Sequence, residues 1–253
     1  MARWFSEILA VSADAIFPLI AEFVAGGTGW DLYDDISAHI KVYRCTGGAV
    51  TFYVEVDHTT ASTVHFKLAT GWDNVNHVYS GYKTGIQELD INAGTYDING
   101  DEATLYIMND LISSNSIIYV GYVIPINPLD LRSICLTGRC TVTTNASAFN
   151  GVNSTQMWLY GAGGGNGNVL QIGSNVTLQY SYNADTGVLY VENYRLAVYN
   201  QYTRYRAYPK YFFPASGYLP PGFVVGDKIK VQGKTYRFKP NHAGGNCALV
   251  QWE

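Results

Sequence analysis

Alternation of polar and apolar residues is the feature that most limits what this chain can fold into. Three segments, 39–44, 51–57 and 64–68, place an apolar side chain at about every second position. Successive side chains of a β-strand point to opposite faces of a sheet, so these segments predict strands with one buried face. The pair Gly47-Gly48 between the first two predicts a tight turn.

Turn residues divide the rest of the chain into more short strands. The segment 117–124 is almost entirely apolar, as expected for a central strand. The last 30 residues predict a compact hairpin unit that ends in a strand from Cys247 to Trp252. The other predicted strands are 86–91, 103–108, 139–144, 155–160, 168–172, 176–182, 187–192, 194–199, 228–231 and 235–238.

Helical periodicity is convincing only at the N-terminus. Apolar residues recur there near a 3.6-residue spacing: Trp4, Ile8, Ala15, Leu19 and Phe23. Pro18 interrupts the pattern, so either the helix kinks there or a second helix starts just before it. Gly26-Gly27 then ends the helical stretch.

These patterns predict a mainly β protein. An N-terminal α-helix (1–25) is followed by antiparallel lobes that resemble a β-sandwich or barrel, and by a small C-terminal β-hairpin unit. Pro125 and Pro128 mark a seam. We therefore expect a β-sandwich-like domain at 26–130 and a second β domain at 131–253, which contains the hairpin unit at 222–253.

Low charge and abundant tyrosine indicate a surface that is covered by other protein. Charged residues make up 14% of the 253 residues, well below the usual quarter, and 21 are tyrosines. Tyrosine combines an apolar ring with one polar tip, which suits contact surfaces. A secreted β-sandwich with a tyrosine-rich surface is the alternative that composition leaves open.

Neither nucleic acid nor membrane is an expected partner. The net charge is −4, and the densest basic stretch, 202–210, alternates with tyrosines as a strand face does. No segment approaches the roughly 18 apolar residues that span a bilayer. Glu7 and Asp14 also interrupt the N-terminal apolar run, so we expect synthesis in a cytoplasm without export.

Several segments mimic functional motifs. The glycines of 161–167 precede a predicted strand, whereas a dinucleotide loop precedes a helix. The segment 97–101 begins like a calcium loop, but Glu102 stands where the loop needs glycine and Met108 where it needs its last acid. An Asn-Gly turn is therefore expected, and an ion site of another kind stays open. Asp31, Asp34 and Asp35 lie beside Trp30, but adjacent acids do not set the separation that glycoside hydrolysis needs.

Cysteine and histidine spacing gives no metal or redox motif. Cys135 and Cys140 are too far apart for a CxxC pair, although a disulfide between them is open in an oxidising environment. Cys45 and Cys247 are expected to be buried thiols, and pairing of either one between subunits stays open. Five histidines lack HxxxH or HExxH spacing: His39, His58, His65, His77 and His242. No catalytic residue, metal or cofactor is predicted, and a zinc site assembled in space stays open.

Three segments resemble virion proteins of tailed bacteriophages. The helix is followed by Gly29-Trp30-Asp31-Leu32-Tyr33-Asp34-Asp35-Ile36, which resembles their Gly-Trp opening with an acidic "DDI" before a strand that contains Val42-Tyr43. The segment from Gly71-Trp72-Asp73 to His77 resembles their "GWD…H" element, and 226–253 is similar to their closing unit. Together these segments cover about a third of the chain.

The resemblance implies a structural subunit of the neck, collar, tail or baseplate, present in the virion in several symmetric copies. Its partners would be further copies of itself and other virion proteins, and it implies no catalytic residues. The interface candidates are Trp4, Phe5, Ile8, Phe23, Tyr199, Tyr202, Tyr205, Tyr208, Tyr236 and Trp252.

Two alternatives remain. In one, the chain is a carbohydrate- or receptor-binding module of a tail fibre or a secreted protein, and it stacks sugars on Trp30, Trp72 or Trp158. In the other, it is a glycoside hydrolase-like enzyme whose acid pair comes from distant strands.

Overall fold

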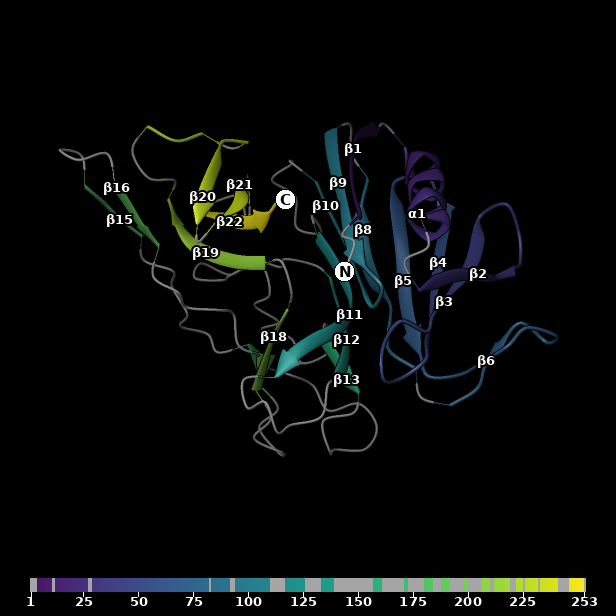
Figure 1. The fold of residues 1–253 in the computed structure, drawn as a ribbon. Helices are drawn as coiled ribbons and strands as arrows, with labels where there is room; N and C mark the ends of the chain where they lie inside the picture. Colours follow the sequence, from purple (N-terminus) through teal and green to yellow (C-terminus); the bar gives the residue numbers. More distant parts are fainter. Residues whose placement is uncertain are drawn as a thin grey trace.

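The protein is mainly β, with one N-terminal helix and several antiparallel sheets, which confirms the predicted fold class (Figure 1). This computed structural model describes residues 4–10, 12–26, 29–81, 83–91, 94–109, 117–125, 133–138, 157–160, 171–172, 180–183, 188–191, 198–199, 206–209, 212–218, 222–224, 226–231, 233–240 and 246–252.

The first sheet is five-stranded and has the order β2-β3-β4-β5-β8. Its strands are β2 (Trp30–Asp35), β3 (Ile40–Cys45), β4 (Phe52–Thr60), β5 (Thr63–Ala69) and β8 (Gln87–Asp90). The predicted alternation is confirmed, because every second residue of β4 from Phe52 to His58 is buried. The strand β2 was not predicted.

The second sheet is nine-stranded. Its strands are β1 (Trp4–Ala10), β9 (Gly94–Asp101), β10 (Thr104–Asn109), β11 (Ile117–Pro125), β12 (Ser133–Gly138), β13 (Met157–Tyr160), β14 (Gln171–Ile172), β17 (Val198–Tyr199) and β18 (Arg206–Pro209). Strand β11 is central, as predicted: Ile118, Tyr119 and Val120 are all fully buried, although they alternate between the two faces.

The two sheets pack face to face as a sandwich around one apolar core. The second sheet contributes Ile98, Leu105 and Val120, and the first contributes Val54 and Phe66. Glycines allow the sheets to approach closely at one end. A side chain at Gly47 would overlap the main-chain carbonyl of Glu102 in the β9–β10 turn.

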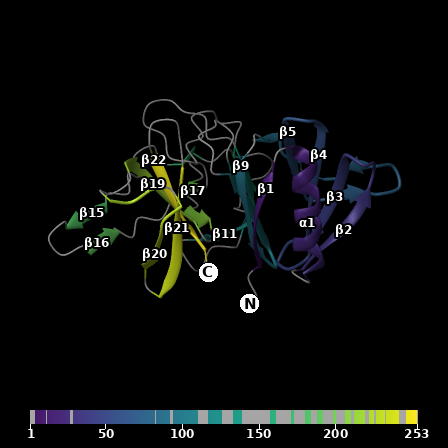
Figure 2. The same cartoon turned by 90° about the horizontal axis from the view of Figure 1, so that it is seen from above.

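The helix fills a wedge between the two sheets. Helix α1 (Ile16–Ala25) follows a 3-10 turn, η1 (Ala13–Ala15), and lies between β1 and β2 when the molecule is seen from above (Figure 2). Its residues Ile16, Leu19, Ile20 and Phe23 are buried in the sandwich core.

The predicted helix over residues 1–25 needs a correction, because residues 4–10 form strand β1. This strand pairs along its length with β9, from Trp4 opposite Gly100 to Ala10 opposite Gly94. Starting the helix at Ile16 puts Pro18 in its first turn, where proline is tolerated; a continuous helix would place Pro18 in the interior.

The expected Asn-Gly turn at 97–101 is also wrong, because these residues belong to strand β9. Asp97 and Asn99 are buried on the face of the sheet that points away from the sandwich core. Asn99 Nδ2 donates to the carbonyl oxygen of Gln251 over 3.2 Å, and Tyr106 Oη donates to the same oxygen over 3.2 Å. The polar sequence that suggested a turn is accommodated in a strand because residues near the C-terminus supply hydrogen-bond partners.

The C-terminal residues form a separate four-stranded sheet of order β19-β22-β21-β20. Its strands are β19 (Phe212–Tyr218), β20 (Lys228–Val231), β21 (Lys234–Pro240) and β22 (Asn246–Gln251). This confirms the strands predicted for the hairpin unit and adds β19. Arg237 Nη1 lies 3.5 Å from Asp97 Oδ1, which joins the unit to β9.

Two short ribbons complete the described structure. They are β6 (Trp72–Asp73) with β7 (Val78–Tyr79), and β15 (Tyr180–Asn183) with β16 (Val188–Val191). The strand predicted at 139–144 lies outside the described residues. The seam near residue 130 stays a prediction; strands from its two sides, β11 and β12, pair in one sheet.

Candidate functional site

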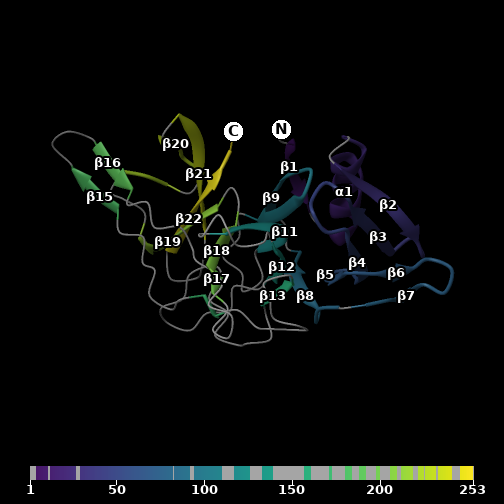
Figure 3. The ribbon, with the colours of Figure 1, turned by 60° about the horizontal axis from the view of Figure 1, so that its bottom comes forward.

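Two segments that lie far apart in the sequence, 29–36 and 71–77, meet at a buried carboxylate. Asp34 lies on β2, just after an irregularity in the pairing of β2 with β3 between Leu32 and Asp34. Its side chain faces the β6–β7 ribbon, whose tip is the turn of residues 74–77. Figure 3 shows this hairpin extending beyond the five-stranded sheet.

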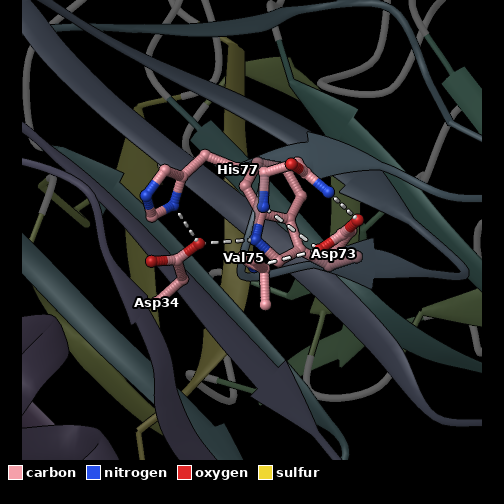
Figure 4. A network of polar contacts seen from close by, with 6 residues as sticks. Asp34, Asp73, Val75 and His77 are labelled. Carbon is pink, nitrogen blue, oxygen red and sulfur yellow. Dashed lines mark hydrogen bonds and ion pairs between the residues drawn. The ribbon is translucent and has the colours of Figure 1, made fainter.

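Asp34 holds both ends of the hairpin turn through one oxygen atom. Trp72 Nε1 donates to Asp34 Oδ2 over 2.7 Å, and His77 Nδ1 lies 2.8 Å from the same oxygen (Figure 4). The Asp34 side chain is 6% exposed, whereas that of His77 is 49% exposed. We call these three residues the Asp34 clasp.

The clasp favours an ionised Asp34. Burial raises the pKa of this carboxyl group, but hydrogen bonds from His77 and Trp72 outweigh it and lower the pKa below its ordinary value. A carboxylate accepts hydrogen bonds and cannot donate one, so the Nδ1 atom of His77 carries a proton. The other ring nitrogen, Nε2, is then left for solvent or for a partner.

A second carboxylate closes the turn itself. Asp73 Oδ1 accepts hydrogen bonds from the backbone amides of Val75, over 2.9 Å, and Asn76, over 3.2 Å. Asp73 Oδ2 accepts another from Asn76 Nδ2 over 2.8 Å. Bonds from an aspartate to the amides two and three residues later are typical of a side-chain-stabilised turn. His77 has a φ of +54°, which a non-glycine residue rarely adopts, and its bond to Asp34 holds it there.

Aromatic packing fixes the base of the hairpin. The rings of Trp72 and Tyr79 meet edge to face, with centroids 4.8 Å apart. The ammonium groups of Lys67 and Lys83 lie 5.6 and 5.2 Å from the Tyr79 ring centroid, within range of a cation–π attraction. Two-stranded ribbons are marginally stable alone, so these contacts give the hairpin a defined position.

The hairpin presents apolar side chains to solvent. Val75, at the tip, is 81% exposed, and Val78 at the start of β7 is also exposed. Single exposed apolar residues are common, but this pair is carried on a short ribbon that two carboxylates hold in place. The arrangement therefore suits contact with another protein. Chemically, the Asp34–His77 pair also orients an imidazole; no hydroxyl or thiol bonds to Nε2 of His77 among the residues that the structure describes.

The other acids of the Asp31, Asp34 and Asp35 cluster form ion pairs. Asp31 accepts from Arg44 Nε over 3.0 Å, and Asp35 lies 2.6 Å from Lys41 Nζ. Each of the three acids thus has its own partner.

The tryptophans considered as sugar platforms are buried where they are described. Trp30 is 5% exposed and donates from Nε1 to the carbonyl oxygen of Asp101 over 3.1 Å, and Trp72 is held in the Asp34 clasp. Neither presents an open ring face to a sugar. Trp158 lies on β13, and its side chain is outside the described part of the chain.

Two of the predicted interface residues belong to the interior. Phe23 is buried in the sandwich core and Tyr236 is buried on β21, because their strand and helix faces point inward. Trp252 is partly exposed, with Lys228 Nζ 3.9 Å and Arg237 Cζ 4.8 Å from its ring centroid. The positions Trp4, Phe5, Ile8, Tyr199 and Tyr208 lie on strands whose side chains are not described, and Tyr202 and Tyr205 lie outside the described residues.

The remaining predictions have mixed outcomes. Cys45 is a buried free thiol, as expected, and its Sγ donates to the carbonyl oxygen of Glu102 over 3.4 Å. Cys135 lies on β12, but Cys140 and the glycines of 161–167 lie outside the described residues. In the described ranges, no helix combines the length and apolarity needed to cross a membrane.

Sequence patterns missed two features of this surface. Val75 lies between polar residues and carries no periodic signal, and the partnership of Asp34 with Trp72 and His77 spans about forty residues of chain. Asp34 lies in the segment 29–36, and Trp72 and His77 lie in the segment 71–77. No protein-family model matches this chain, and no curated protein matches it.

Proposed function

We propose that this chain is a structural subunit of a tailed-phage virion, in the neck, collar, tail or baseplate, and that it acts by assembling with further copies of itself. The observation that supports the proposal best is the clasped hairpin. A short ribbon with an exposed apolar tip is fixed by a buried carboxylate, and this ribbon and its anchor come from two of the three segments that resemble phage virion proteins.

A rigid hairpin reduces the entropy cost of forming an interface. Loops that order on binding lose about 0.5–1.5 kcal/mol for each side chain that becomes immobilised. Here the turn is already held by Asp73 and by the Asp34 clasp. A valine at such a preorganised tip can insert into an apolar pocket of a neighbour at little entropy cost.

Exposed apolar residues at both ends of the molecule favour head-to-tail association. Val75 lies on the β6–β7 hairpin, and Val224, 63% exposed, lies just before β20. Figure 1 places β6 and β20 at opposite sides of the molecule. A contact that joins two different surfaces generates a ring when the rotation closes, and a ring agrees with the several symmetric copies that the phage resemblance implies.

Negative-stain microscopy of the purified full chain tests the proposal. We expect ring-shaped particles for the wild type, and smaller, single-chain particles for Val75→Glu, which places a charge at the apolar tip. The variant Thr60→Glu is the matched control, because Thr60 is exposed at the end of β4 and outside the hairpin. Single-chain particles for the wild type, or rings that survive Val75→Glu unchanged, would contradict the proposal.

A further inference from the structure

A cluster of three potential metal ligands lies away from the hairpin, where the N-terminal segment meets the five-stranded sheet. Asp14 belongs to the 3-10 turn η1, His39 to the connection between β2 and β3, and His58 to β4. One ligand atom from each residue lies within 4.8 Å of the other two. The three residues are separated in sequence, which is why spacing motifs did not reveal them.

The contacts of His58 leave one of its ring nitrogens facing the carboxylate of Asp14. The His58 side chain is 4% exposed, its Nε2 lies 3.3 Å from the carbonyl oxygen of Ala38, and its Nδ1 lies 3.2 Å from Asp14 Oδ1. A carbonyl oxygen can only accept, so Nε2 carries the proton in that bond. Nδ1 then directs its lone pair toward Asp14 Oδ1, and a metal ion between these two atoms would bind both.

The backbone arranges the two histidines in advance. The amide of His58 donates to the carbonyl oxygen of His39 over 3.0 Å. Ser37 Oγ accepts from the amides of His39 and Ile40, each over 3.1 Å, and so holds the turn that carries His39. Phe17 packs against the His58 ring with centroids 4.0 Å apart and shields one side of the cluster.

We propose that Asp14, His39 and His58 bind a divalent transition-metal ion of the Zn²⁺ class. Two imidazoles and one carboxylate form a ligand set that such ions accept, with water in the remaining position. The bond from His58 to Ala38 is the kind of second contact that orients a ligating histidine. The ion would tie η1, and helix α1 behind it, to the turn between β2 and β3.

The geometry requires a small adjustment at one ligand. Tetrahedral Zn²⁺ with bonds of about 2.0–2.1 Å places its ligand atoms roughly 3.3–3.4 Å apart. The 3.2 Å between His58 and Asp14 fits that spacing. His39 is exposed, so its ring can turn to close the remaining separation.

Titration calorimetry with ZnCl₂ on the full, untagged, chelator-treated chain tests the site. We expect one ion per chain with micromolar affinity, and affinities about tenfold or more weaker for the variants Asp14→Asn and His39→Gln. Both residues are exposed, so these variants should fold. His65→Gln is the control and should bind as the wild type does, because His65 lies on β5 outside the cluster.

Cobalt gives a readout that does not depend on variants. Co²⁺ in the same site should show the intense visible absorption of a low-coordinate ion, and Zn²⁺ should displace it. No Zn²⁺ binding by the wild type, or equal binding by the wild type, Asp14→Asn and His39→Gln, would overturn the proposal.

Discussion

Substitution of Asp34 measures how much its two hydrogen bonds to the hairpin contribute to the free energy of unfolding. Hydrogen bonds to a charged group contribute about 1.5–3 kcal/mol each. We expect the bond from Trp72 to contribute this full amount to the free energy of unfolding, because the indole is buried. The bond from His77 contributes less to the free energy of unfolding, because that ring is half exposed and water can replace Asp34 as its partner.

The size of the loss depends on what replaces the carboxylate. In Asp34→Asn, the amide oxygen can still accept from Trp72 as a neutral bond, so we expect a loss of about 1–2 kcal/mol in the free energy of unfolding. Asp34→Ala leaves Trp72 Nε1 buried without its acceptor, so the expected loss is about 3 kcal/mol. Asp35→Asn is the control; Asp35 is 56% exposed and its ion pair with Lys41 contributes about 0–1 kcal/mol.

Urea denaturation followed by tryptophan fluorescence measures these free energies. Amide hydrogen exchange adds a local readout, since the Ser80 amide bonds to the carbonyl oxygen of Gly71 over 3.0 Å at the base of the hairpin. Exchange across residues 71–80 should accelerate in Asp34→Asn and not in Asp35→Asn. Equal stability losses in these two variants, with unchanged exchange, would refute the role given to the clasp.

Three further predictions concern pH, backbone packing and thiol reactivity. The pKa of Asp34 is lower in the folded than in the unfolded state, so the contribution of its ionised form to the free energy of unfolding is complete above the unfolded pKa of about 3.9. That contribution is lost as the pH falls through the folded pKa. When urea denaturation is repeated from about pH 6 to about pH 3, the difference in stability between the wild type and Asp34→Asn should therefore narrow. In the same assay, Gly47→Ala should lower the free energy of unfolding by about 2–3 kcal/mol, because its Cβ would overlap the carbonyl of Glu102. Gly222→Ala should lower it by about 1 kcal/mol, because Gly222 has a φ of +87° but open space around it. Equal losses would contradict the close packing of the sheets. Burial raises the pKa of Cys45 to about 12, so peptide mapping after iodoacetamide treatment at about pH 8 should find it unlabelled in the folded chain and labelled in urea; rapid labelling of the folded chain would contradict its burial.

Local patterns predicted the strands whose environments are simple. Segments 51–57 and 64–68 have one buried face each, and the apolar run 117–124 is buried on both faces, so periodicity was sufficient. Strand β9 was missed because Asp97 and Asn99 are polar and buried. Their burial depends on Arg237 and Gln251, more than a hundred residues away.

The N-terminal strand was missed for a different reason. Trp4 and Ile8 fit a helical spacing as well as a strand, and β1 forms because β9 offers a complete edge for pairing. The Asp34 clasp and the Asp14, His39 and His58 cluster were equally hidden, since both join residues from different strands and turns. The sequence contains the residues of the Asp34 clasp, but only tertiary packing brings them into contact.

The mass of the native, untagged chain in solution tests the central claim most directly, because a subunit that acts by assembly must associate with itself. Sedimentation equilibrium over a range of concentrations should give a defined multiple of the 27.9 kDa chain mass for the wild type, and a lower mass for Val75→Glu. A wild-type chain that stays at 27.9 kDa at every concentration would contradict the account.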